Sequence, residues 1–172
     1  MNAALRLSWY KFKHHYMDFV KVLLGIIAFE GLILYIQDKG FLKDFETTRM
    51  TLFLLLFSTS LLIVVQNSIY ISKERSVLNR DFFSGLSRSA FAIASMGIHA
   101  FFAVLETIVF ILSYSIFSKY FDKEFPDAGH IFSSYRWEVG ITVLLVFLAS
   151  HFIALFLSLI HISEPTRQAE IS

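Results

Sequence analysis

Four long apolar stretches constrain this chain more than any other feature. They cover residues 19–36, 50–71, 90–117 and 139–156, and each approaches or exceeds the roughly 20 apolar residues that a helix needs to cross a bilayer. Backbone groups inside hydrocarbon must bond within their own segment, so such stretches fold as helices. The sequence therefore predicts an all-α, polytopic membrane protein with four transmembrane helices, and we expect this bundle to be incomplete.

The overall composition agrees with a membrane protein. Hydrophobic residues make up 56% of the chain and charged residues only 17%, whereas soluble domains carry about 25% charged residues. A net charge of +1 gives no basic face for nucleic acid, so no nucleic-acid partner is expected. The chain has no cysteine, which excludes disulfides, thiol nucleophiles and thiolate-bound metals.

The distribution of lysine and arginine in the flanking segments predicts the orientation, because cytoplasmic loops carry the excess of these residues. Eight lie around the start of the first span or between the second and third spans, and six lie in the other two loops. We therefore expect an integral protein of a bacterial plasma membrane, with a cytoplasmic N-terminus and a cytoplasmic loop at residues 72–89. The eight are Arg6, Lys11, Lys13, Lys21, Lys73, Arg75, Arg80 and Arg88, and the six are Lys39, Lys43, Arg49, Lys119, Lys123 and Arg136.

The N-terminal segment, residues 1–18, has the pattern of an amphipathic helix. Large apolar side chains recur at spacings of four and three, which places them on one helical face. A basic helix of this kind, rich in aromatic residues, lies in the membrane interface. It serves either as an anchor for the first span or as an element that contacts a cytoplasmic partner. The apolar residues are Leu5, Trp9, Phe12, Tyr16 and Phe19.

The loop at residues 72–89 predicts a second, shorter amphipathic helix. Leu78, Phe82 and Leu86 are four residues apart and form an apolar stripe, while charged residues occupy the other faces. Gly85 is placed to end or bend this helix. Such a helix at the cytoplasmic face is suited to dock on another protein. The alternative is an ordinary charged loop that packs on its own bundle.

This loop resembles the first intracellular loop of ABC exporter permeases of the type-2, G-subfamily-like class. The shared features are Glu74 within a Lys/Glu/Arg cluster, then Arg80-Asp81, then Gly85-Leu86-Ser87 before the next span. The family often has a tyrosine where this chain has Phe91. The order of elements also matches over residues 5–156: an interfacial connecting helix, two spans, a coupling helix and a long third span.

The resemblance implies a permease half whose coupling helix contacts an ABC ATPase domain. The sequence contains no Gly-x-x-x-x-Gly-Lys-[Ser/Thr] phosphate loop, so we expect no enzyme activity and no cofactor in this chain, with ATP and Mg²⁺ on the partner. A second permease half, identical or different, would complete the transporter. The coupling residues that the resemblance and the stripe together predict are Glu74, Arg75, Leu78, Arg80, Phe82, Phe83 and Gly85.

Polar side chains inside the spans form a second group of candidates. Ionisable groups at membrane depth are costly and mark substrate or proton pathways, but polar groups also join helices by hydrogen bonds. His99 and Glu106 share a face of the third span and lie too far apart to bind one metal ion unaided, so no metal site is predicted. The candidates for a translocation path or for interhelical contacts are Glu30, Asn67, His99, Glu106 and His151.

Two other functions remain open from the sequence. The chain could be a membrane anchor or regulatory subunit that does not transport and holds a partner through residues 73–88. It could also be an ion-coupled carrier that uses Glu30 and Glu106.

The last 16 residues, 157–172, differ from the rest of the chain. Written back into codons, Leu157 to Arg167 matches the transposon mosaic end followed by the sequencing adapter of tagmentation libraries, and residues 168–172 fit an index and the next adapter segment of such libraries. We therefore interpret residues 157–172 as translated adapter DNA. The natural reading frame is expected to continue past Phe156 into further spans, of which permeases of this class often have six.

Overall fold

The computed structural model describes residues 16–37, 45–85, 87–122, 131 and 134–169, with the side chains of 70–76, 79, 81, 88 and 158–169 excepted. Regular structure in these residues is helical: α2 (Tyr16–Ile36), α3 (Phe45–Phe83), α4 (Arg88–Tyr120) and α5 (Tyr135–Ala169). Each helix contains a segment long and apolar enough to cross a membrane: Tyr16–Ile36, Phe45–Ile69, Ser89–Tyr120 and Tyr135–Leu157. The prediction of an all-α protein with four candidate spans is confirmed.

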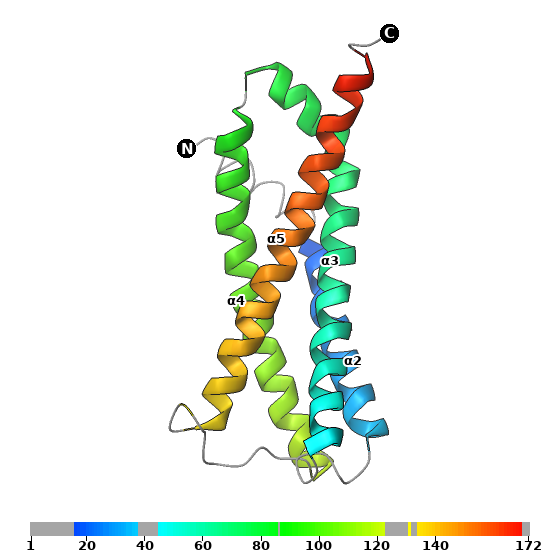
Figure 1. Ribbon diagram of the computed structural model, residues 1–172, viewed down its shortest axis with the longest axis vertical. Helices are drawn as coiled ribbons and strands as arrows, with labels where there is room; N and C mark the ends of the chain where they lie inside the picture. Colours follow the sequence, from blue (N-terminus) through cyan, green and yellow to red (C-terminus); the bar gives the residue numbers. More distant parts are fainter. Residues whose placement is uncertain (1–15, 38–44, 86, 123–130, 132–133, 170–172) are drawn as a thin grey trace.

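The other two predicted helices have different outcomes. The interfacial helix predicted over residues 1–18 lies outside the described residues, except for its last three, which begin α2. The separate short helix predicted within 72–89 is not seen, because α3 runs unbroken from Phe45 to Phe83 and includes this segment. In Figure 1 the last turns of α3 lean across the end of the bundle toward the start of α4.

The turn between α3 and α4 follows from local chemistry. Gly85 has a φ of 102°, a conformation that side chains with a Cβ rarely adopt, and its N–H donates to the carbonyl of Phe82. Ser87 then caps α4, with its hydroxyl accepting from the backbone N–H of Ala90. The predicted role of Gly85 as the end of the helix is confirmed.

The four helices pack as a ring. Helix α2 contacts α3 and α4, and α5 contacts the same two helices from the other side. Figure 1 shows α2 alongside only one half of the long α3, while α4 and α5 continue toward the α3–α4 turn. A central core takes residues from every helix, so all four are joined at one level: Val22, Ile26, Ile63, Ala103, Phe110, Val143 and Phe147.

Helix α2 approaches the side chain of Leu62 on α3 closely at Gly25. A Cβ at this position would lie 2.6 Å from a methyl carbon of Leu62, whereas a Cβ at Gly97 would meet no atom within 4 Å. Small residues of this kind let transmembrane helices approach each other closely.

We predict that Gly25→Val destabilises the bundle by about 1–3 kcal/mol, the usual effect of overpacking. Gly97→Val is the matched control, because it makes the same change in a helix where space is free, and we expect its effect to stay below about 1 kcal/mol. Reversible unfolding in mixed micelles measures both variants. Equal effects at the two positions would show that the contact between Gly25 and Leu62 does not limit helix packing.

Candidate functional site

A buried polar cluster, called here the His151 cluster, joins α3, α4 and α5. His151 of α5 lies at its centre: Nε2 is 2.8 Å from Oε2 of Glu106, and Nδ1 is 3.1 Å from Nδ1 of His99. The same Nδ1 is 3.0 Å from Nδ2 of Asn67 on α3. His99, Glu106 and His151 are buried and Asn67 is half-buried. Four of the five polar residues predicted in the spans therefore meet in one place.

The spacing of residues along α4 explains why His99 and Glu106 are connected through His151 and do not contact each other directly. His99 and Glu106 are seven residues apart, so they lie on the same face about 10 Å apart along the axis. That distance prevents direct contact, and the imidazole of His151 occupies the interval with one ring nitrogen toward each partner. The prediction that His99 and Glu106 share a face is confirmed, since both bind the same ring.

The hydrogen-bond pattern constrains the ring hydrogens. With Glu106 as a carboxylate, Nε2 of His151 carries the hydrogen and donates it, so Nδ1 is an acceptor. His99 then donates from Nδ1, and Asn67 donates one amide hydrogen, so these two donors share the single lone pair on Nδ1 of His151. Asn67 donates its other amide hydrogen to the carbonyl of Ile63. Because both nitrogens of His151 are engaged on opposite sides, the cluster does not converge on one ion. In the described residues no group of three His, Cys, Asp or Glu side chains is arranged for a metal.

Glu30 belongs to a separate contact. It is fully buried on α2, and its Oε2 meets the hydroxyl of Ser113 on α4, while Oε1 has no hydrogen-bond partner among the described residues. The prediction that grouped Glu30 with Glu106 is therefore not supported by contact between them. Ser113 was not predicted from the sequence. Its position seven residues after Glu106 could have indicated it, because His99, Glu106 and Ser113 form one polar line along α4.

The residues predicted to couple to an ATPase domain fall into two groups. Leu78 is buried with Phe91 and Leu155, and the ring of Phe82 lies 5.8 Å from that of Phe91. These two side chains pack on their own bundle, as the alternative interpretation of this loop expects. Arg80, Phe83 and Gly85 are exposed, and the side chains of Glu74 and Arg75 lie outside those described.

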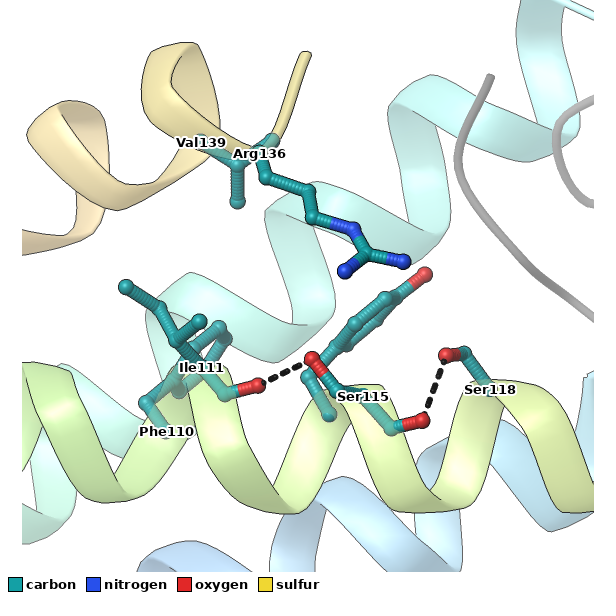
Figure 2. A pocket seen from close by; sticks show the side chains of 7 residues that line it. Phe110, Ile111, Ser115, Ser118, Arg136 and Val139 are labelled. Atoms are coloured by element: carbon teal, nitrogen blue, oxygen red, sulfur yellow. Dashed lines mark hydrogen bonds between the residues drawn. The ribbon is translucent and has the colours of Figure 1, made fainter. Parts of the chain in front are cut away.

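The opposite end of the bundle contains a cavity of about 240 Å³ between α3, α4 and α5. It is lined mainly by apolar side chains, with Tyr135, Glu138 and Thr142 as polar members. A smaller pocket of about 20 Å³ beside it has room for one water molecule. In Figure 2, Arg136 reaches from the start of α5 toward the part of α4 that carries Ser115 and Ser118.

The two serines in this smaller pocket are already bonded within α4. Ser115 donates to the carbonyl of Ile111 at 2.7 Å, and Ser118 donates to the carbonyl of Ser115 at 3.3 Å (Figure 2). Arg136 is therefore the charged group that this pocket presents.

Comparisons with protein-family models, curated proteins and solved structures find no match for this chain.

Proposed function

We propose that this chain is the membrane-spanning permease portion of an ATP-driven exporter of the ABC type-2 class. The observation that supports the proposal best is the helical end of α3, which leans over the end of the bundle and turns through Gly85 into α4 (Figure 1). The motif that resembles the family, with Glu74, Arg80-Asp81 and Gly85-Leu86-Ser87, lies in this segment.

The end of α3 that carries Leu78, Arg80, Phe82 and Phe83 is called here the leaning segment. One side of it packs on the bundle, and the other side is exposed. Leu78 and Phe82 fix it to α4 and α5, so a force on the segment acts on three spans at once. Arg80 and Phe83 lie on the exposed side, and Phe83 is 86% exposed. Arginine and large aromatic residues are enriched among the residues that dominate protein interfaces. This pair is therefore the surface that we assign to the ATPase domain, in place of the larger patch predicted from the stripe.

The proposed mechanism is a shift between two states of the bundle. In this mechanism ATP and Mg²⁺ bind to partner ATPase domains, and closure of these domains displaces the leaning segment. The spans then switch between an inward-facing and an outward-facing state. A ligand shifts such an equilibrium only by its difference in affinity for the two states, so the ATPase domains must bind the leaning segment more tightly in one of them. A second permease half provides the other wall of the path.

A photocrosslinking experiment tests the assigned surface. Benzoylphenylalanine replaces Phe83 in one variant and Tyr120 in the other, which is equally exposed (82%) at the opposite end of the bundle. Both are expressed in the source cells and irradiated in native membranes with a photoreactive ATP analogue. We expect the probe at position 83, and not at position 120, to capture a polypeptide that also carries the ATP label.

A charge substitution supplies the control for this experiment. Arg80→Glu should reduce capture at position 83 severalfold, because it reverses the charge on the assigned surface, while Arg80→Lys should retain most of it. If position 83 captures no ATP-labelled polypeptide, or if both positions capture it equally, the proposed coupling surface is wrong.

A further inference from the structure

The His151 cluster can hold its hydrogens in two arrangements, which differ in the contact between Asn67 and His151. In the first arrangement, Glu106 is a carboxylate, His151 carries its hydrogen on Nε2 and His99 carries its hydrogen on Nδ1. In the second, Glu106 is a carboxylic acid that donates to Nε2 of His151. His151 then donates from Nδ1 to His99, whose hydrogen is on Nε2. Both histidines are neutral in both arrangements, and the second holds one more proton.

We propose that the His151 cluster is a proton-uptake site in which a proton enters at His99 and comes to rest on Glu106. A proton from water binds Nε2 of His99, and the hydrogen on Nδ1 of His99 passes to Nδ1 of His151. The hydrogen on Nε2 of His151 then passes to Oε2 of Glu106. Within the cluster three N–H or O–H bonds form and two break, and the third bond that breaks is an O–H bond of the hydronium ion that delivers the proton to His99. The net change is one bound proton, which removes the carboxylate charge.

The geometry gives each residue its role in this transfer. The two steps cross contacts of 3.1 Å and 2.8 Å, which are distances at which hydrogen-bonded groups exchange protons. His99 is 7% exposed, whereas His151 and Glu106 are 1% exposed. His99 also lies closer along α4 to the turn at Ser87 than Glu106 does. We therefore assign the entry of the proton to His99, on the side of the cluster that faces the α3–α4 turn.

Asn67 distinguishes the two arrangements. Its amide donates to Nδ1 of His151 at 3.0 Å, a contact that exists only while this nitrogen is an acceptor. The other amide hydrogen remains bonded to the carbonyl of Ile63 in both arrangements. Asn67 therefore favours the arrangement without the extra proton and acts as a positioning residue for His151.

Among the described residues, the titratable groups that take part in the proton transfer are those of the cluster itself. On α4 and α5 these are His99, Glu106 and His151, and on α3 the contact comes from the neutral Asn67. On α2, Glu30 contacts Ser113, and Lys21 pairs with Asp18 at 2.8 Å on an exposed surface. The proposal does not depend on coupling to an ATPase domain.

Spectroscopy of the full chain in phosphatidylcholine–phosphatidylglycerol vesicles tests the proposal. Solid-state NMR with ¹⁵N-labelled histidine reports which ring nitrogen carries the hydrogen, and infrared spectra report the carbonyl band of a carboxylic acid. As the pH is lowered, we expect His151 to change from the Nε2–H to the Nδ1–H form and His99 from Nδ1–H to Nε2–H. A carboxylic acid band should appear at the same midpoint.

Three variants make this result specific. Glu106→Gln keeps an acceptor for His151 but cannot take up the proton, so both the change of tautomer and the new band should be lost. Glu30→Gln is the matched control and should retain both, because Glu30 does not contact the cluster. Asn67→Leu removes a donor from the first arrangement only and should move the change to higher pH.

Two results would overturn the proposal. His151 could keep one neutral tautomer over the whole pH range in which the protein stays folded, which would make the cluster a static contact between helices. Alternatively, His151 could become doubly protonated and charged while Glu106 remains a carboxylate, which would make it an ordinary titrating histidine.

Discussion

Replacement of His151 alone by leucine is expected to destabilise the bundle more than joint replacement of His151 and Glu106. His151→Leu leaves Glu106 buried without a partner, and removal of one member of a buried pair costs about 3–5 kcal/mol. We expect a value of about 3 kcal/mol, because an isolated buried carboxylate can take up a proton. His151→Leu with Glu106→Leu removes both polar groups, and we expect it to lie within about 1–2 kcal/mol of the unsubstituted chain.

Reversible unfolding in mixed micelles gives the free energies for this comparison. Ser150→Ala is the control on the same helix, because the hydrogen bond of Ser150 in the described residues runs to the carbonyl of Val146 within α5. Its effect should stay below about 1 kcal/mol. Glu106→Leu alone completes the set of variants. If the double variant loses as much free energy of unfolding as His151→Leu and Glu106→Leu lose together, the two residues contribute independently and the pairing is wrong.

Phe147→Ala should be the most damaging truncation in the central core. Phe147 is fully buried, and its ring meets that of Phe110 edge-on at 5.7 Å. Truncation of a core phenylalanine costs about 3–5 kcal/mol through lost contacts and the cavity that remains. We expect the lower half of this range, because lipid tails offer an unfolded helix the same apolar surroundings.

Phe57→Ala is the matched control for this truncation. Phe57 is 52% exposed on the outer face of α3, and its described ring contact is with Phe53 of the same helix. Loss of its ring should change the free energy of unfolding by less than about 0.5 kcal/mol. Equal losses at Phe147 and Phe57 would contradict the packing of α5 against the other helices.

The spans could be predicted from the sequence because the length of an apolar run is a local property. The predicted starts are late by up to five residues, since the first turns contain residues such as Glu46 and Arg49, which pair with each other on an exposed surface. A prediction from the length of an apolar run leaves out charged turns of this kind, although these turns belong to the same helix.

The contacts between helices could not be predicted in the same way. Periodicity places His99 and Glu106 on one face of α4, but it does not say that α5 lies opposite and brings His151 between them. The stripe of Leu78 and Phe82 poses the same problem. Its spacing shows that one face is apolar, whereas the residues that cover this face are Phe91, at the start of α4, and Leu155 of α5, which is distant in sequence. A single sequence does not distinguish a partner protein from the chain's own later helix.

The position of His151 on α5, far along the chain from Glu106, has a consequence for biosynthesis. Glu106 and its partner are 45 residues apart, so at about 5–20 residues per second the ribosome makes His151 about 2–9 s after Glu106. During that interval α3 and α4 exist without the imidazole that contacts both of them. Leu78 likewise has no Leu155 to cover it. The nascent chain therefore needs α5 to leave the insertion machinery before its buried carboxylate is matched, and quality control has those seconds in which to recognise an unfinished bundle.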